Sequence, residues 1–418
     1  MAEQRTFDVA IVGAGPVGLI TGLACAACGL KPAVIGPAAD PADGRTAALL
    51  DGSINLLKRL QVWSRIDPIS EPLTGIRLVD ATGSLLRAPE VLFRASEVGL
   101  EAFGYNVPNA GLTAALEAAC TSRLTRIVSK GVTAFDLGGD LAQLTTSEGA
   151  TLFASLVAAA DGRASATRAA AGIATSGWSY PQAAVVTTFT HGRPHFGIST
   201  ELHHYHGPLT VVPGPKNTSS LVWVESPAEA EGLAGLTDCD FAHALGSRLH
   251  GLLGTLSCFT PRRTYPLASQ RAPVMGKNRV ALVGEAAHLI PPIGAQGLNL
   301  GFRDAATLAE AARDALHEDN DIGGEAALAH YDRLRQADVT SRFFAVDLLN
   351  RSLLSRLPGV QLARALGLFA LAVSPPLRRR IMREGIMPSA ASPALMLPIQ
   401  LHGDTADGTL DCPAPQQA

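Results

Sequence analysis

Residues 7–36, FDVAIVGAGPVGLITGLACAACGLKPAVIG, contain the pattern that decides the fold of this chain. Apolar residues up to Val12 predict a short buried strand, and a helix follows to about Cys28, where Gly29 ends it. A second strand is predicted in the letters KPAVIG. A strand, a helix and a second strand in this order predict an α/β domain with a parallel sheet.

Three glycines lie in the turn between the first strand and the helix. Gly13, Gly15 and Gly18 form the pattern G-x-G-x-x-G. Without side chains, the backbone N–H groups can approach a pyrophosphate closely, and the helix amino terminus faces that anion. Three glycines can also mark only a tight turn, but their place between a strand and a helix favours a bound dinucleotide.

The end of the second strand lacks the acid that commonly binds the adenosine ribose. Gly36 stands there, and Asp40 or Asp43 in the following loop is either a substitute or a solvated turn residue. Arg45 then precedes TAALLDGSINLLKRLQVW, whose apolar periodicity predicts a helix. Arg45 is either a partner for a phosphate or an exposed side chain.

A second signal lies in the middle of the chain. The apolar run ATLFASLVAAA predicts a strand that ends at Asp161 and Gly162, with a helix starting after Ser165. Ligands of open α/β sheets bind beyond the carboxyl ends of the strands, so Asp161 is a candidate site residue. An ordinary Asp-Gly turn explains the same letters.

The third signal is VGEAAHLIPPIGAQGLNLGFRD, residues 283–304. A strand ends at Glu285, two prolines at 291–292 stiffen the backbone, and Gly294 and Gly297 let it approach a flat ligand. The helix that begins near Gly297 points its positive end at that ligand. Because a reduced isoalloxazine is negatively charged, this stretch predicts a flavin site.

Two side chains of this segment have alternative interpretations. Glu285 would accept hydrogen bonds from the ribitol chain or screen the pyrophosphate region. His288 either lines the flavin edge or packs at the turn, and no general base is assigned.

These three segments, in this order, resemble the fingerprints of the FAD-dependent aromatic-ring monooxygenases, with the p-hydroxybenzoate-hydroxylase-like fold. The similarity is closer to one branch of this class. DGRTAAL, GYNVPNAGLTAAL, WSYPQAAVV, GPLTVVPGPKNTSSLVW, RTYPLA and GAQGLNLGFRDAATLAE are similar to the ubiquinone-biosynthesis hydroxylases, and they extend over residues 7–350. The chain departs from that pattern at Glu285, where the family usually has Asp, and at Ala295, where it usually has Gly.

The resemblance implies an α/β fold in which a Rossmann-like FAD-binding domain is interleaved with a smaller antiparallel-sheet substrate domain, followed by a helical C-terminus. The implied boundaries are 1–72, 95–175 and 262–345 for the FAD-binding domain, 73–94 and 176–261 for the substrate domain, and 346–418 for the C-terminal helical region.

The resemblance also implies a chemistry. NAD(P)H or a protein electron donor reduces FAD, dioxygen is the co-substrate, and a phenolic, polyprenylated ring is hydroxylated in ubiquinone biosynthesis. The alternatives are a related flavoprotein oxidoreductase acting on another lipid or aromatic substrate, and a non-catalytic FAD-binding subunit of a biosynthetic complex. The expected FAD-binding residues are Gly13, Gly15, Gly18, Arg45, Asp161, Glu285, Pro292, Gly294, Gln296, Gly297, Leu298 and Asn299.

The composition limits these functions further. A chain of 418 residues predicts two domains, and 47% hydrophobic with 17% charged residues excludes a disordered protein. The net charge of −3 gives no footprint for nucleic acid. The amino terminus shows no secretory signal, and six cysteines make no disulfide framework, so a cytoplasmic location is expected.

We expect no metal site. Cys25 and Cys28 form a C-x-x-C, but its Ala-rich surroundings predict a packed helix. His203, His204 and His206 lie in ELHHYHG without an evident acid or Cys partner, and an exposed strand or loop is the preferred interpretation.

The C-terminal region raises the question of a membrane. The apolar run ALGLFALAV, residues 365–373, is far shorter than the roughly 20 residues needed to cross a bilayer. The following SPPLRRRIMREGIM, with Arg378, Arg379, Arg380 and Arg383, is either an interfacial helix at the inner face of a membrane or a solvated helix. The sequence leaves open whether the chain forms a homo-oligomer or joins a ubiquinone-biosynthesis complex.

Overall fold

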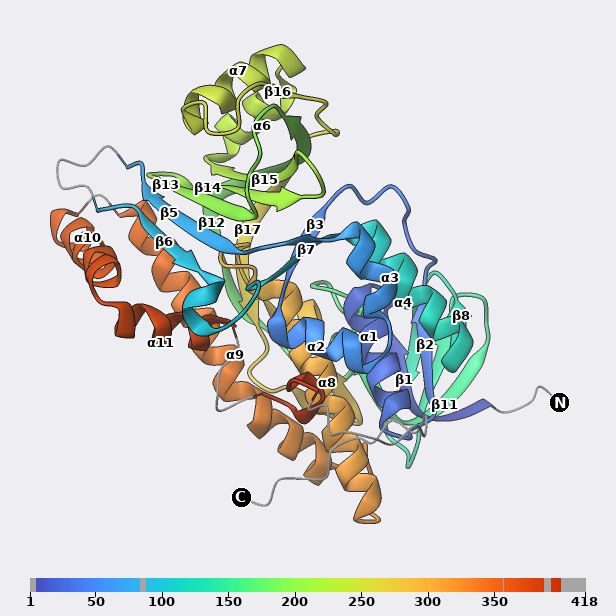
Figure 1. Ribbon diagram of the computed structural model, residues 1–418. Helices are drawn as coiled ribbons and strands as arrows, with labels where there is room; N and C mark the ends of the chain where they lie inside the picture. Colours follow the sequence, from blue (N-terminus) through green and yellow to red (C-terminus); the bar gives the residue numbers. More distant parts are fainter. Residues whose placement is uncertain (1–4, 83–87, 356, 387–391, 400–418) are drawn as a thin grey trace, which may run out of the picture.

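A computed structural model describes residues 5–82, 88–355, 357–386 and 392–399 of the chain. Figure 1 shows a first sheet with its helices on one side of the molecule, a second sheet above it, and the last helices along the opposite side. The remainder of the predicted C-terminal region, residues 387–391 and 400–418, lies outside the described residues.

The first sheet surrounds β1 (Arg5–Val12). This strand pairs in parallel with β2 (Pro32–Gly36) and β11 (Thr151–Ala159), and α1 (Pro16–Ala27) connects β1 to β2 as predicted. Neighbours on both sides explain why the last four residues of β1 are apolar and buried. The other strands of this sheet are β8 (Thr125–Val128), β9 (Val132–Asp136), β10 (Ala142–Thr146), β18 (Gly276–Lys277) and β19 (Val280–Leu282).

The second sheet joins segments that are far apart in the sequence. β13 (Ile198–His204) pairs with β5 (Gly75–Asp80), which brings the early segment into the later domain as the interleaved arrangement requires. The full order is β20 (His288–Leu289), β17 (Arg263–Arg271), β12 (Ser176–His191), β15 (Thr218–Glu225), β14 (Gly207–Gly214), β13, β5 and β6 (Val91–Arg94), with β16 (Leu256–Ser257) beside β12.

The predicted α/β class with an interleaved second domain is confirmed, with one correction. The second sheet is not antiparallel throughout, because β13 and β5 run parallel. This sheet also takes in β17 and β20, which come from the range 262–345 and yet pair within it.

The helix predicted directly after Arg45 begins later. Residues Thr46–Leu50 form β3, which pairs with β7 (Gly104–Pro108), and α2 (Asp51–Arg59) follows. β7 also pairs with β4 (Glu71–Pro72), so the three strands make a small sheet of their own. Pairing with a strand more than fifty residues away overrides the helical periodicity of this segment.

Helices cover both sheets. Trp223 of β15 packs with Phe241 and Leu245 in a core beneath the helices of the second domain. Besides α1 and α2, the helices up to residue 317 are α3 (Trp63–Ile66), α4 (Asn109–Arg123), α5 (Ala166–Ala170), α6 (Pro227–Gly235), α7 (Asp238–Leu249) and α8 (Gln296–His317). The short 3-10 helices are η1 (Asp67–Ile69), η2 (Ala95–Val98), η3 (Gly284–Ala286) and η4 (Ala394–Met396).

The C-terminal part is helical, as predicted. It consists of α9 (Glu325–Leu354), α10 (Pro358–Val373) and α11 (Pro375–Ile386). No single helix in the described residues is long and apolar enough to cross a membrane, although α9 and residues 359–373 together reach that length and composition across a bend of 119°.

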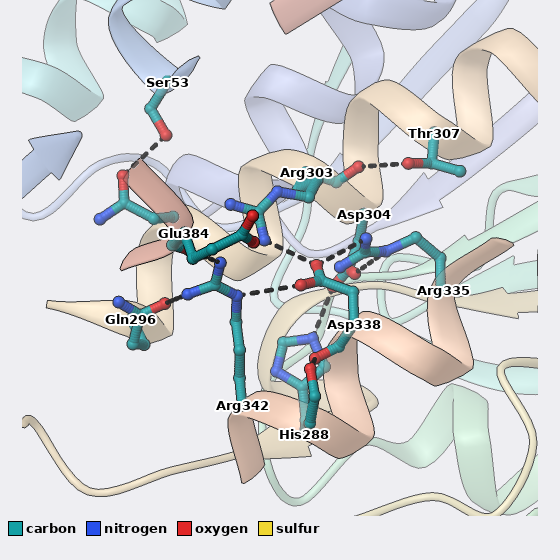
Figure 2. A network of polar contacts seen from close by, with 12 residues as sticks. Ser53, His288, Gln296, Arg303, Asp304, Thr307, Arg335, Asp338, Arg342 and Glu384 are labelled. Carbon is teal, nitrogen blue, oxygen red and sulfur yellow. Dashed lines mark hydrogen bonds and ion pairs between the residues drawn. The ribbon is translucent and has the colours of Figure 1, made fainter. Parts of the chain in front are cut away.

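A buried group of charges ties α8 to α9. On α9, Asp338 accepts from Arg303 at 2.6 Å, from Arg335 at 2.9 Å and from Arg342 at 2.9 Å, while Arg335 also donates to Asp304 of α8 at 2.8 Å (Figure 2). The side chains of Asp304 and Arg335 are 0% exposed. We call these five residues the Asp304–Asp338 network.

The arginines of this network fix the charge of its acids. Burial raises the pKa of Asp338, but Arg303, Arg335 and Arg342 outweigh that effect and lower it to about 2. A folded-state pKa below the ordinary 3.8 means that the carboxylate stabilises the fold above pH 4. This contribution is lost as the pH falls through about 2.

The substitution Asp338→Asn should therefore destabilise the protein. It leaves buried arginines without their shared counter-charge, so the free energy of unfolding at pH 7 is expected to fall by about 3–5 kcal/mol in urea denaturation. Because wild-type Asp338 is protonated at low pH, the difference between the two proteins should shrink between pH 4 and 2.

A matched control is Asp314→Asn on α8, which removes a carboxylate that is 37% exposed from its pair with Arg313. Its effect should stay below about 1 kcal/mol. Equal losses in the two variants, or a difference from wild type that is constant down to pH 2, would contradict the role given to Asp338.

Candidate cofactor site

The first two predicted segments meet at the turn after β1. Gly13 has φ +115°, and a Cβ there would lie 2.2 Å from the carbonyl oxygen of Ala160, the residue before Asp161. A Cβ on Gly18 would lie 1.9 Å from the carbonyl oxygen of Gly13. Packing between the strand ends therefore demands both glycines.

Gly15 differs from its two neighbours in the pattern. It is exposed, has an ordinary extended conformation at φ −73°, and a Cβ built on it would meet nothing within 4 Å. The fold does not need a glycine there. A side chain at Gly15 would fill only the space in front of the amino terminus of α1, where a pyrophosphate would bind.

The third segment packs on the same helix end. Gly284 has φ +60°, and a Cβ on it would lie 3.1 Å from Val17 of α1. A Cβ on Gly301 of α8 would lie 2.7 Å from the same valine and 3.3 Å from the Cα of Gly284. The three segments, which are more than a hundred residues apart in sequence, therefore converge on the amino-terminal ends of α1 and α8.

The acids of the second and third segments have different environments. Asp161 accepts hydrogen bonds from Ser165 and, at 3.0 and 2.9 Å, from the backbone and hydroxyl of Thr167, so its carboxylate holds the start of α5. Glu285 is exposed. Of the two predicted acids, Glu285 is the better placed to reach a ligand.

The inward acid of the third segment is Asp304, which sequence reasoning missed. Its carboxylate accepts from the backbone N–H of Gly284 at 2.9 Å and contacts His288 Nε2 at 2.6 Å. His288 is 2% exposed, so it packs at the turn. The sequence feature that could have identified Asp304 is an acid placed among the apolar residues of GFRDAATLAE.

The candidate acids near the end of β2 have partners in their own loop. A Cβ on Gly36 would lie 2.7 Å from the backbone nitrogen of Ala14, which leaves no room for a side chain. Asp40 accepts from the backbone of Ala42 at 2.9 Å and is a turn residue. Asp43 accepts two hydrogen bonds from the guanidinium of Arg45, both of 2.8 Å.

Arg45 is half-exposed and borders a cavity. Hydrogen bonding from Arg45 lowers the pKa of Asp43 to about 2, against the opposing effect of burial. Asp43, Arg45 and Thr46 lie along a cavity of about 230 Å³, whose other wall includes Thr188 and Ser220 of the second sheet. Arg45 therefore lies where the loop that leads into β3 faces the second sheet.

Residues 291–299, which we call the flavin loop, lead into the amino terminus of α8. Pro292, Gly294 and Gly297 are exposed there and Leu298 is half-buried, while the side chain of Gln296 donates to the carbonyl oxygen of Gly294 at 2.9 Å. Gly294 has φ +66°, a conformation that favours glycine.

Two residues of the loop carry further constraints. Ala295 caps α8 with φ +55°, a left-handed conformation that costs an L-residue about 1–2 kcal/mol. Asn299 is buried, and its side chain accepts from Leu50 N and Ser53 Oγ and donates to the carbonyl oxygens of Ala48 and Ala295. The Asn299 side chain therefore holds β3 and α2 against the start of α8.

The metal-ligand candidates have other partners in the structure. His206 Nδ1 lies 2.8 Å from Glu225 and 2.9 Å from Glu229, so the expectation that these histidines lack acid partners is wrong. The pairing of β14 with β15 brings Glu225 close to His206, and the hydrogen bond between the two side chains raises the pKa of His206. In α1, burial raises the pKa of the Cys25 thiol to about 12, which argues against a reactive or metal-binding thiolate.

A Rossmann-type sheet with three glycine-lined segments at one edge, beside a second sheet, defines a dinucleotide-binding flavoprotein. Residues 6–341 match the family described as "FAD binding domain". The chain is 36% identical over 398 residues to the ubiquinone hydroxylase UbiL of Rhodospirillum rubrum, covering 92% of this chain and 90% of that protein. The chain belongs to the FAD binding domain family and, within it, to the ubiquinone hydroxylases, as the sequence predicted.

Two further similarities agree with this assignment. The 3-demethoxyubiquinol 3-hydroxylase of Escherichia coli is 29% identical over 92% of this chain and 100% of its own length. The crystal structure of p-nitrophenol 4-monooxygenase from Pseudomonas putida superposes with a TM-score of 0.74 at 21% identity, over 91% of this chain and 98% of that one. The second similarity concerns the fold alone.

The contrast between Gly15 and Gly18 gives a test of the site. Gly15→Val should abolish the flavin absorbance of the purified protein and leave its thermal midpoint close to that of the wild-type apoprotein, because the side chain enters only ligand space. Gly18→Val should lower the free energy of unfolding by about 1–3 kcal/mol or more, because it enters packed backbone. Absorbance spectra and thermal denaturation measure both, and full FAD binding by Gly15→Val would refute the site.

Proposed function

We propose that this chain is an FAD-dependent monooxygenase that hydroxylates a phenolic, polyprenylated ring in ubiquinone biosynthesis. One observation carries the proposal: the chain is similar, along nearly the whole length of both proteins, to relatives named as ubiquinone hydroxylases. The convergence of three glycine-lined segments at one edge of the first sheet supports it.

The residues around that edge suit FAD. Gly15 and the amino terminus of α1 would hold the pyrophosphate, and Arg45 would pair with a phosphate or line the cavity beside the second sheet. The flavin loop and the positive end of α8 would hold the isoalloxazine, and Glu285 would accept hydrogen bonds from the ribitol hydroxyls. Bound FAD supplies the activation of dioxygen once NAD(P)H or a protein donor has reduced it.

The protein's own contribution would be position and exclusion of water. The cavity between Arg45 and Ser220 lies between the loop that leads into β3 and the second sheet. A ring held there would be screened from solvent by that loop and the second sheet. No side chain of the described residues is assigned as a general base.

An oxygen electrode tests the function. Purified protein with FAD, a reductant and a polyprenylated phenol is expected to consume oxygen in a substrate-dependent way and to form a hydroxylated product, identified by mass spectrometry. Product without oxygen uptake would favour a reductase, and neither would favour a non-catalytic subunit. Gly15→Val, which should lack FAD, is the matched negative control.

We also infer that the C-terminal helices contact an anionic membrane surface. Leu362, Leu366, Phe369 and Val373 are 44–59% exposed and recur every three or four residues, so they form one apolar face of α10. On α11, an open hollow is lined by Pro376, Arg379, Arg380, Arg383 and Glu384. An apolar face beside arginines suits a bilayer with anionic headgroups.

Arg378 is not part of this basic surface. Its guanidinium pairs with Glu97 at 2.6 Å and donates to the carbonyl oxygens of Leu371 and Ala372 at the end of α10. Changing Arg378 would therefore disturb the packing of α11 as well as its charge.

Liposome flotation tests the membrane contact. The protein should float with anionic vesicles, less so at high salt, and the triple change of Arg379, Arg380 and Arg383 to Ser should weaken binding, since each arginine near such a surface contributes about 1 kcal/mol. Arg333→Ser, an exposed position on α9, is the control. No flotation of the wild type, or none lost in the triple variant, would exclude this surface.

A further inference from the structure

Arg342 connects three elements that the sequence separates. From α9 its Nε donates to Asp338 at 2.9 Å, its Nη1 donates to Gln296 Oε1 at 2.5 Å, and its Nη2 donates to the carbonyl oxygen of Glu384 at 3.1 Å. Figure 2 shows the guanidinium between the carboxylate of Asp338 and the amide of Gln296. The Asp304–Asp338 network thus reaches the first residue of α8 and the end of α11.

The contact with Gln296 continues into the flavin loop. Gln296 accepts from Arg342 through Oε1 and donates through Nε2 to the carbonyl oxygen of Gly294, so its amide cannot turn over without losing both bonds. Ala295 lies between Gly294 and Gln296 and has a left-handed conformation that is unfavourable for a residue with a Cβ. A loop in such a conformation persists only where its surroundings hold it.

The side chain of Arg342 is also largely shielded from solvent. Its side chain is 11% exposed, and the network contains three arginines against two aspartates. Arg342 is the arginine of this set that contacts the flavin loop. Its positive charge lies at the amino terminus of α8 and adds to the positive end of the helix dipole.

We infer that Arg342 is a positioning residue for the cofactor: through Gln296 it fixes the flavin loop and brings positive potential to the end of α8. The inference rests on the proposed placement of FAD against the flavin loop. The competing role is structural only, in which Arg342 joins α9 to α11 and has no effect on the cofactor.

The two roles differ in what they predict for bound FAD. Arg342→Met should weaken FAD affinity by about 10–100-fold, the range expected for one hydrogen bond to a charged group. It should also lower the flavin reduction potential, because positive charge favours the reduced, anionic flavin. Arg342→Lys keeps the charge but not the fork of donors, so it should restore the potential more than the affinity.

Gln296→Met provides an independent variant that keeps the buried network intact, since Gln296 is only half-buried. It should weaken FAD binding, and Arg342→Met should add little in the double variant if both act through one contact. The control is Arg351→Met on the same helix, where Arg351 pairs with Asp347 away from the loop. It should leave affinity and potential at the wild-type values.

FAD titration by fluorescence quenching and spectroscopic potentiometry on the full chain decide the matter without any substrate. Arg342→Met with wild-type affinity and potential would overturn the inference, even if its stability fell. If Arg342→Met does not fold, unchanged FAD affinity in Gln296→Met overturns it equally. A wild type that binds FAD and hydroxylates nothing would defeat the proposed function and leave this inference standing.

Discussion

The buried pairing of two aspartates with three arginines is the constraint on which the cofactor edge depends. Asp304 holds the backbone of Gly284 and the ring of His288, and Asp338 holds the arginines that reach back to α8. An isolated buried charge is costly, so the acids and arginines stabilise the fold only while they remain together. The turn after β19, β20, α8 and α9 are therefore fixed as one unit.

Close backbone contact is the second requirement, and it explains why glycines cluster at this edge. Gly13 lies against Ala160, and Gly301 lies against Val17 and Gly284. Each contact brings a strand end or helix end closer than a side chain would allow. The same approach directs the amino termini of α1 and α8 toward one region, where two helix dipoles favour an anionic ligand. These packing glycines thus shape the edge at which Gly15 leaves space open for a ligand.

The C-terminal helices extend this arrangement to the surface. α11 packs against η2 through Arg378 and Glu97, and its last turn accepts hydrogen bonds from Arg342. The apolar face of α10 is turned outward instead of into a core. Arg342 of α9 links the end of α11 to Gln296 of the flavin loop, so the helix pair that exposes leucines is connected to the candidate cofactor site.

The sequence by itself determined the local units: the β1–α1–β2 order and the three glycine segments, which follow from periodicity and short-range spacing. The family and the helical C-terminus followed from the resemblance of its motifs to the ubiquinone-biosynthesis hydroxylases. It did not predict that Thr46–Leu50 is a strand or that β17 belongs to the second sheet, because those outcomes depend on distant pairing partners. Only the tertiary structure decided the roles of Asp304, Asp338 and Arg342. In the sequence these three residues resemble charged residues on a solvent-exposed helix face. Packing buries them, and a buried charge requires a partner.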